Sequence, residues 1–529
     1  MNHRMVDFRF QQYFTRPKEH PTSVKLPASY VLAVLSGFLM MLSMPSYDLP
    51  YLAWFGLVPL LISLKGKNAL HSYLLINVCT AVWSIGTHLW YPSIFGWSGY
   101  LIMVAGGLYY GAAVKTGYDM SRRIGKWYGI FALPVTFGVF EWIKTVIPFT
   151  KTWWIELLAK SQWTVPSNLQ LLSVTGFVGL TFIIMLTNVA LAQLLASLGE
   201  RRKLPLLPAL LLLVPVANAV FGAILVKNHA EPRQTIRIGA NVDLVNQDAE
   251  VIASGGQNQA GDGYLADTPE MQRKIFDINT ELSAELLLRS GPVDVLVWGE
   301  NEFIRLDDAD MIRRLAAFAE ETGAYIAVDG VWETGGAMHD TAYLMSPAGE
   351  EAGRTPKIFT LWGEEAHGFS PGPRDYRVHD TELGRIALAV CWDRHDPSIL
   401  RGYARNGARL ALIPADDDFN GDSRFPYFAA SDAVFRAVEN RLAIGSGSTS
   451  GIAQVITPYG EMTAMSGVNE RQAIVGTTFV TESPTFYTRY GDVFAYLLGA
   501  CFVIMLIISE RNKKKLKPVS VKANSAHPQ

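Results

Sequence analysis

Two blocks of long apolar segments flank a more polar middle part of the chain. A helix needs about 20 mostly apolar residues to cross a membrane, because unpaired backbone groups cannot sit in lipid. Seven candidate spans precede the middle part and one follows it: Ala28–Pro45, Pro50–Leu64, Leu70–Trp90, Gly99–Tyr118, Trp127–Ile147, Leu171–Leu198, Leu204–Val226 and Val493–Ile508. The second is short enough to lie partly at the membrane interface. The pattern predicts a polytopic α-helical membrane bundle of about eight helices.

The middle part alternates short apolar runs with helical periods, which is typical of an α/β domain. Strands are predicted at Ile236–Val242, Val293–Trp298, Tyr325–Val331, Arg385–Cys391, Leu410–Ile413, Ala443–Gly447, Ile452–Ile456 and Ala473–Phe479, and helices at Met271–Arg289, Asp307–Thr322, Pro397–Gly407 and Phe425–Glu439. Because the strands are continuously apolar, we expect helices on the sheet faces. The predicted division is a transmembrane domain over residues 1–226, an α/β domain over 227–490, and a last helix with a basic tail over 491–529.

Lys and Arg residues gather in alternate connections between the predicted spans, and such basic connections stay in the cytoplasm. The connections after the first, third and fifth spans carry only Lys144, Lys151 and Lys160. The basic residues on the other side are Arg4, Arg9, Arg16, Lys18, Lys25, Lys65, Lys67, Lys115, Arg122, Arg123, Lys126, Arg201, Arg202, Lys203, Arg511, Lys513, Lys514, Lys515, Lys517 and Lys522. Both termini are therefore predicted to be cytoplasmic and the α/β domain extracytoplasmic.

The links on the extracytoplasmic side are rich in aromatic residues, namely Trp90, Tyr91, Trp97, Trp153, Trp154 and Trp163. Indole rings favour the headgroup level, so an aromatic belt is the first interpretation and a lipid-facing mouth to a site is the alternative. Glu141 and Lys144, spaced i,i+3 near the end of the fifth span, either neutralise each other or serve a function.

Composition narrows the class of protein further. With 49% hydrophobic and 18% charged residues the chain is too apolar for an ordinary soluble enzyme, and a net charge of -2 gives no sign of a nucleic-acid partner. The three cysteines, Cys79, Cys391 and Cys501, offer neither a disulfide framework nor a CxxC metal pattern. Cys391 stands alone in the α/β domain, either as a small buried hydrophobe or as a nucleophile.

Three polar residues stand where strands or strand-like runs end: Glu300 after VLVWG, Lys357 after a predicted hairpin, and Cys391 after IALAV. Each alone is most simply a surface charge or a buried thiol, but ligand sites of layered α/β folds gather at strand ends. Together they could perform acyl transfer: a carboxylate base, a thiol that attacks a carbonyl carbon, and an ammonium that stabilises the oxyanion. The expected intermediate is a thioester on Cys391.

Glu, Lys and Cys in this order resemble the nitrilase superfamily, and the membrane segments narrow the resemblance to the apolipoprotein N-acyltransferases. The motifs that carry it are LSMPSYDLPYLAWFGLVPLL, LPVTFGVFEWIK, GFVGLTFIIMLTN, KIFTLWGEE, FSPGP, FRAVENRLAI and TFYTRYGD, spread over nearly the whole chain. The resemblance implies an extracytoplasmic, nitrilase-like α-β-β-α sandwich carried on the membrane bundle. It also implies a multi-pass protein of the bacterial cytoplasmic (inner) membrane.

The resemblance assigns Glu300 as general base and acid, Lys357 as oxyanion stabiliser and Cys391 as nucleophile. It implies an acyltransferase that moves a fatty acyl chain from a phospholipid donor to the N-terminal amine of a diacylated lipoprotein, as a monomer. Neither a metal nor an organic cofactor is needed for that chemistry. A membrane-anchored amidase, an acyltransferase for another amine, and an inactive scaffold are the competing hypotheses.

Supporting roles fall to Trp392, to Asp393, and to Glu364 or its neighbour Glu365. Asp393 stands where the family usually has Glu, and an acid there is expected to pair with Lys357. Four stretches depart from the family pattern: Trp298-Gly299-Glu300 for Trp-Pro-Glu, Cys391-Trp392-Asp393 for Cys-Tyr-Glu, Ala415–Phe419 for Asn-Asp-aromatic, and Gly447–Gly451 for the late Asn-Thr-Gly turn. The run Asp416–Asp418 lacks His or further carboxylates at ligand spacing, so a capped loop is favoured over a metal site.

Overall fold

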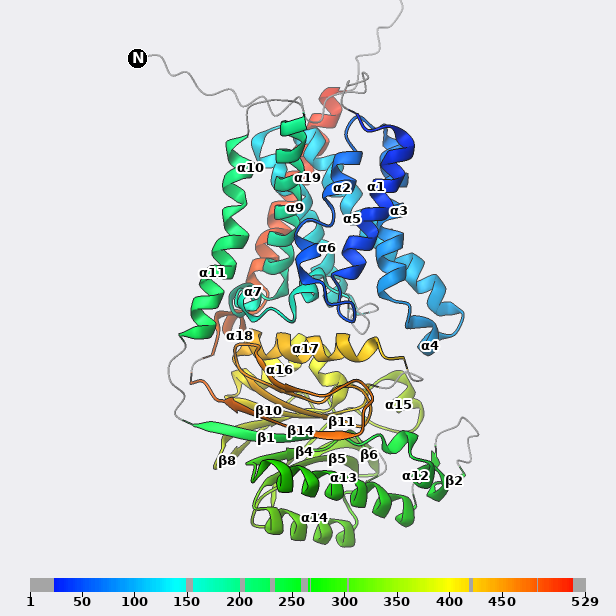
Figure 1. The fold of residues 1–529 in the computed structure, drawn as a ribbon, viewed down its shortest axis with the longest axis vertical. Helices are drawn as coiled ribbons and strands as arrows, with labels where there is room; N and C mark the ends of the chain where they lie inside the picture. Colours follow the sequence, from blue (N-terminus) through cyan, green and yellow to red (C-terminus); the bar gives the residue numbers. More distant parts are fainter. Residues whose placement is uncertain are drawn as a thin grey trace, which may run out of the picture.

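The structure is a computed structural model that describes residues 23–148, 156–199, 205–228, 234–257, 265–266, 268–301, 304–417, 422–482 and 484–516. It consists of a helical bundle and a sheet domain stacked end to end (Figure 1). The last bundle helix, α19, runs from the sheet domain to the opposite end of the bundle. The membrane and α/β parts expected from the hydropathy pattern are therefore separate layers of one molecule.

The bundle is built from long apolar helices joined by short helical pieces. The long helices are α1 (Leu26–Leu42), α3 (Ala69–Thr87), α5 (Ser98–Ile124), α6 (Ala132–Val146), α9 (Phe177–Gly199), α11 (Leu213–Lys227) and α19 (Val493–Leu516). The short pieces are η2 (Pro50–Trp54), α2 (Val58–Ser63), α4 (Tyr91–Phe95), η3 (Trp127–Phe131), η5 (Leu158–Gln162), α7 (Pro166–Leu169), α8 (Leu172–Thr175), α10 (Leu206–Leu211) and α18 (Phe486–Tyr490).

The predicted fold class is confirmed, whereas the predicted number of spans is not established. Among the described residues, five helical segments are long and apolar enough to cross a membrane: Ala69–Thr87, Trp127–Val146, Phe177–Gly199, Leu206–Lys227 and Val493–Lys513. Two apolar helical segments, Leu26–Leu42 and Pro50–Ser63, are shorter. The second of these is broken into η2 and α2, in keeping with its short apolar run.

The sheet domain contains the strands β1 (Thr235–Val242), β4 (Val295–Val297), β5 (Tyr325–Thr334), β6 (Ala337–Met345), β7 (Glu351–Pro356), β8 (Val378–Thr381), β9 (Gly384–Leu388), β10 (Leu410–Ala415), β11 (Ala443–Ser448), β12 (Gln454–Ile456), β13 (Met462–Met465) and β14 (Gln472–Phe479). The main strand order is β7-β6-β5-β4-β1-β11-β10-β9-β8, with β14 added on β1 and with β12 and β13 added beside β11. Along this order the two halves meet between β1 and β11, where Val242 and Ser448 are the one pair in register. The sheet is therefore folded into two facing layers.

Helices cover both outer faces of the folded sheet. Figure 1 shows α13 (Pro269–Ser290) and α14 (Ala309–Thr322) on the side away from the bundle, and α16 (Pro397–Arg405) and α17 (Phe425–Asn440) between the sheet and the bundle. The smaller elements are α12 (Ala249–Ser254), β2 (Gly256–Gln257), β3 (Leu265–Ala266) and α15 (Trp362–Ala366). This arrangement confirms the expected α-β-β-α sandwich.

One hydrophobic core runs without a break from the bundle into the sheet domain. The same buried cluster contains Trp90 of the bundle, Phe425 of α17 and Ile413 of β10. A second core, including Val297 and Leu388, fills the space between the sheet layers, and a third, including Trp298, lies under α13 and α14. The sheet domain is thus packed on the membrane part through apolar surface, whose removal from water stabilises the contact.

Among the aromatic residues of the extracytoplasmic links, Trp97 fits the belt interpretation, whereas Trp90 and Trp163 fit neither interpretation. Trp97 is 76% exposed, as a belt residue would be, whereas Trp90 and Trp163 are buried. Trp90 packs on Phe425, with ring centroids 4.9 Å apart, and the Trp163 indole N–H donates to Asp48 at 2.6 Å. Trp153 and Trp154 lie outside the described residues. The buried tryptophans are therefore packing residues of the junction between the two parts of the molecule.

Two departures from the family pattern meet in space. A Cβ on Gly299 would lie 2.3 Å from the backbone nitrogen of Thr449, far closer than any van der Waals contact. The Thr449 hydroxyl in turn donates to the backbone oxygen of Glu300 at 2.6 Å. Gly299 thus makes room for Thr449, and Thr449 fixes the backbone of Glu300.

We predict that Gly299→Ala destabilises the protein and lowers its activity, because the new methyl group must push the segment after β4 away from the segment after β11. Overpacking of this kind costs about 1–3 kcal/mol. Thermal unfolding of the solubilised full chain measures the effect, with Gly499→Ala as the control, since nothing lies within 4 Å of that position. A Gly299→Ala protein that unfolds at the wild-type temperature would contradict this close approach.

Candidate active site

Cys391 sits at a sharp turn rather than at the end of a strand. The apolar run predicts a strand up to Cys391, but β9 ends at Leu388 and Cys391 begins the short helix η7 (Cys391–His395). Its φ is 41°, in the left-handed region that side-chain-bearing residues seldom adopt. Backbone strain of this kind persists only where the surrounding structure holds it in place, and it concentrates at functional sites.

Asp393 ties the nucleophile turn to the segment that follows Lys357. Its carboxylate accepts hydrogen bonds from the backbone N–H groups of Val390 at 3.2 Å, Ile358 at 3.1 Å and Phe359 at 2.8 Å. The prediction that Asp393 pairs with Lys357 is therefore wrong. Among the described residues, backbone amides bind the Asp393 carboxylate instead. Asp393 aligns two segments that are distant in the sequence.

Glu300 follows β4, and both its backbone N–H and its carboxylate are fixed by contacts. Its backbone N–H donates to the Ala415 oxygen at 3.0 Å, and its Oε2 accepts from the Asp416 N–H at 2.8 Å. Its Oε1 lies 2.6 Å from the Lys357 Nζ. The Cys391 Sγ donates to the Asp416 backbone oxygen at 3.4 Å, so the same peptide segment contacts both Glu300 and the thiol.

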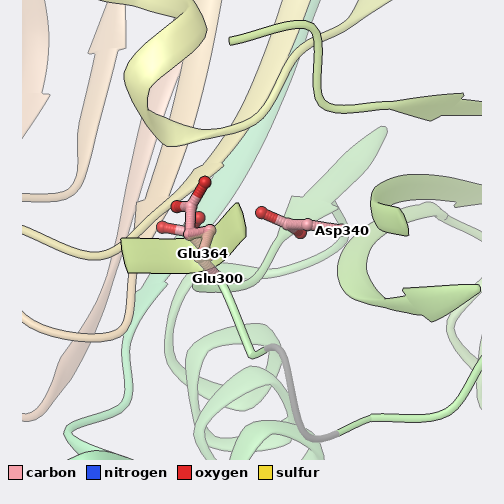
Figure 2. Close-up of side chains that lie close together, drawn as sticks. All are labelled: Glu300, Asp340 and Glu364. Carbon is pink, nitrogen blue, oxygen red and sulfur yellow. The ribbon is translucent and has the colours of Figure 1, made fainter. Parts of the chain in front are cut away.

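Three carboxylates surround the ammonium group of Lys357. Its Nζ lies 2.6 Å from Glu300, 2.9 Å from Asp340 and 2.5 Å from Glu364. Figure 2 shows the three carboxylates, which come from separate segments of the chain. Their oxygens lie within 4.8 Å of one another, close enough to hold a metal ion. The Lys357 ammonium already provides the positive charge that such a cluster needs, so a second cation there would be repelled.

The structure places Glu364, and not Glu365, beside Lys357. The other oxygen of Glu364 accepts from the Leu361 N–H at 2.9 Å, while Glu365 accepts from the Thr360 hydroxyl at 2.7 Å. Sequence reasoning missed Asp340 and its neighbour Asp329. A signal for Asp329 was available, since it is a charged residue inside the apolar run YIAVDGV, but the strand that carries Asp340 was not predicted.

The charges of this cluster determine the protonation of its members. Burial lowers the pKa of Lys357, but the carboxylates of Asp340, Glu300 and Glu364 together raise it well above its ordinary value. Burial and Asp340 raise the pKa of Asp329 far above its usual range, which favours its protonated form. Burial and Glu300 also raise the pKa of Cys391, although Lys357 acts in the opposite direction. These shifts favour an ammonium on Lys357 and a neutral thiol on Cys391 in the resting site.

Trp392 and the Asp416–Asp417 segment build the walls behind the nucleophile. The Trp392 ring stacks on Phe425, with centroids 5.9 Å apart and planes at 12°. The Asp416 carboxylate accepts from the Asn246 amide at 3.1 Å and from the Ser450 hydroxyl. Asp417 forms a buried ion pair with Arg394. Asp418 lies outside the described residues, and the two described aspartates act as structural anchors of this loop.

A cavity of about 410 Å³ lies in the bundle between α3, α4, α5 and α6. Its lining is mostly apolar and includes Phe95 and Ile102, with Lys144 and Glu156 among its polar groups. Lys144 donates to the Tyr110 hydroxyl at 2.7 Å, and Glu141 accepts from the Leu158 N–H at 2.6 Å. Tyr91 lines the cavity and contacts Trp90, with centroids 4.4 Å apart, so aromatic packing joins the cavity to the wall behind Cys391.

Comparison with known proteins identifies two domains in tandem. Residues 36–190 match the apolipoprotein N-acyltransferase N-terminal domain, and residues 291–477 match the carbon-nitrogen hydrolase family. The apolipoprotein N-acyltransferase of Geobacter metallireducens is 28% identical over 92% of this chain and 96% of its own length. That of Thermotoga maritima is 22% identical over 93% of this chain and 96% of its own.

Among solved structures, an amidase from Nesterenkonia sp. is 19% identical and aligns with a TM-score of 0.38 over 51% of this chain and 97% of the amidase. The family assignment stands on the two domain matches and on relatives that align along nearly the whole length of both chains. This chain belongs to the apolipoprotein N-acyltransferases, bacterial membrane proteins in which a helical membrane domain precedes a carbon-nitrogen hydrolase domain.

Proposed function

We propose that this protein transfers a fatty acyl chain from a phospholipid, through a thioester on Cys391, to the N-terminal amine of diacylglyceryl-cysteine in apolipoproteins. The observation that carries the proposal is the buried set of Glu300, Lys357 and Cys391 in a domain that shares its hydrophobic core with a membrane bundle. Both proposed substrates are anchored in the bilayer, so a site seated on the bundle can meet them.

In the first half-reaction, the Cys391 sulfur attacks the ester carbonyl carbon while Glu300 takes the thiol proton. The carbonyl oxygen becomes an oxyanion. When the ester C–O bond breaks, Glu300 returns the proton to the departing glycerol oxygen, and a lysophospholipid leaves. The neutral acceptor amine then attacks the thioester, Glu300 takes its proton and passes it to the departing sulfur, and an amide and a free thiol result.

Lys357 supplies a donor to the oxyanion only as the reaction proceeds. The ammonium has three N–H groups, and in the resting site three carboxylates surround it. Once Glu300 has accepted the thiol proton it is neutral, and its hold on Lys357 weakens. One N–H then turns to the oxyanion, together with the backbone N–H of Trp392. Asp340 and Glu364 keep the ammonium in position throughout.

The apolar cavity of the bundle supports a lipid as acyl donor, because its lining favours hydrocarbon and lies behind the aromatic wall of the site. The described basic residues support the orientation with the sheet domain outside the cytoplasm. Arg123 pairs with Glu510 at 2.8 Å, and Tyr118 donates to the Leu64 oxygen at 2.9 Å, so the basic ends of α2, α5 and α19 gather at one end of the bundle. Both termini are then cytoplasmic. Glu300, Lys357 and Cys391 all come from one chain, so the protein acts as a monomer.

We predict an acyl adduct on the Cys391 peptide when the full chain is incubated with phospholipid vesicles, detected by mass spectrometry. Cys391→Ala abolishes the adduct, whereas Cys501→Ala, which removes an exposed cysteine of α19, leaves it intact. Adding a diacylated lipopeptide converts the adduct into triacylated product. An unmodified Cys391 under turnover conditions contradicts the proposal, and release of free fatty acid or cleavage of small amides instead favours the amidase hypothesis.

We also predict that Glu300 and Lys357 shift the reactivity of Cys391 in opposite directions. Because the Glu300 charge raises the thiol pKa and Lys357 lowers it, Glu300→Gln lowers the pKa of Cys391 and Lys357→Met raises it further. Alkylation of Cys391 by iodoacetamide at about pH 8 should be faster in Glu300→Gln and slower in Lys357→Met, while both variants lose acyl transfer by about 10²-fold or more.

A Cys501→Ala background keeps the exposed thiol out of this measurement. In the wild-type chain the alkylation rate should still be rising at about pH 9, because the thiol pKa lies above the ordinary cysteine value. A plateau below about pH 8 would show that the resting site holds a thiolate instead, and slower alkylation in Glu300→Gln would show that Glu300 acts on the resting thiol as a base more than it raises the thiol pKa.

A further inference from the structure

Three buried polar side chains form a continuous network across the junction between the bundle and the sheet domain. Lys160 belongs to η5, on the bundle side, and its Nζ lies 2.7 Å from the Oδ2 of Asp432 in α17. The same oxygen lies 2.7 Å from the Nδ1 of His395, at the end of η7. Lys160 and Asp432 have no exposed side-chain surface, and His395 has 2%. This network lies outside the cluster around Lys357.

The charges of the network follow from its burial. Burial lowers the pKa of His395 to about 4 even with Asp432 beside it, so the imidazole is neutral and donates its Nδ1–H to the carboxylate. Burial raises the pKa of Asp432, but Lys160 and His395 lower it below its ordinary value. Burial lowers the pKa of Lys160 to about 8. At neutral pH an ammonium from the bundle thus neutralises the carboxylate that holds His395.

His395 contacts the residue next to the nucleophile. Its ring lies edge-on to the Trp392 indole, with centroids 4.5 Å apart and planes at 62°. Phe425 stacks on Trp392, and Trp90 of the bundle packs on Phe425. The backbone at Cys391 is held in a strained conformation, so it depends on these contacts for its geometry.

We propose that Lys160 is a positioning residue for the nucleophile turn: by neutralising Asp432 it lets that carboxylate hold His395 against Trp392, and so fixes Cys391 and the neighbouring backbone N–H. The bundle is then part of the active-site structure in addition to anchoring it. The expected effect on acyl transfer rests on the proposed function, whereas the effect on the reactivity of the Cys391 thiol does not.

The test compares full-length Lys160→Met with the double variant Lys160→Met/Asp432→Asn, both in the Cys501→Ala background. Lys160→Met leaves Asp432 without its ammonium partner, and thioester formation from phospholipid should slow by about tenfold to a hundredfold, since small misplacements of reacting groups have effects of that size. The donor concentration for half-maximal rate should stay unchanged. The double variant should recover most of the rate, because the amide oxygen introduced at this position of α17 can accept the His395 proton without any charge to neutralise.

Lys115→Met is the matched control, since it removes a bundle lysine that pairs with Asp119 at 2.5 Å, remote from the sheet domain. It should form the thioester at the wild-type rate. The iodoacetamide rate and its pH profile, measured on Cys391 without lipid, should change in Lys160→Met and return in the double variant. The alkylation measurement remains valid even if the wild-type chain takes no acyl group from phospholipid. Failure of the proposed function can therefore be distinguished from failure of the proposed role of Lys160.

The proposal is overturned if folded Lys160→Met has the wild-type thioester rate and the wild-type alkylation profile. It is also overturned if the double variant regains the wild-type unfolding temperature but stays as slow as Lys160→Met, because the effect would then not pass through Asp432. Should Lys160→Met fail to fold, the double variant decides alone: its neutral pair should support a thioester rate close to that of the wild type.

Discussion

The ammonium of Lys357, buried among three carboxylates, is the interaction on which the rest of the site depends. A buried ammonium is costly unless it is paired, and a cluster of buried carboxylates is equally costly without a cation. Each therefore requires the other. Glu300 follows β4, Asp340 lies in β6 and Glu364 lies in α15, so Lys357, which follows β7, fixes these elements relative to one another. Burial and the charge of Glu300 raise the pKa of Cys391 and so favour its neutral thiol, while Lys357 acts in the opposite direction.

The second constraint is the way the sheet domain sits on the bundle. A tethered domain would need only a flexible link, but here one hydrophobic core includes bundle helices, α16, α17 and the adjacent face of the sheet. The turn that carries Cys391 faces this junction, and Trp392 and His395 point into it. The mechanical support of the nucleophile therefore comes partly from the membrane domain. For substrates that cannot leave the bilayer, this is the appropriate side for a site.

The departures from the family pattern around the site are compensated by the structure. A Cβ on Gly299 would collide with Thr449, so the glycine leaves the space that the threonine needs. Asp393, where the family usually has Glu, reaches three backbone N–H groups with its shorter side chain. Asp416 is anchored by Asn246 and Ser450, and its N–H holds Glu300. Asp393 and Asp416 thus connect the segments that carry Lys357, Cys391 and Glu300.

The sequence by itself determined the membrane part, the α/β pattern and the strand-end positions of Glu300 and Lys357, because apolar period and run length are local properties that survive in any fold. It misplaced the end of β9 and the partner of Asp393, and it gave no sign of Asp340 or of the pairing between Lys160 and Asp432. Those features depend on strand register and on the packing of the bundle against α17, which bring together residues up to 272 positions apart. Only the tertiary structure decides such contacts, since burial and charge pairing act between neighbours in space.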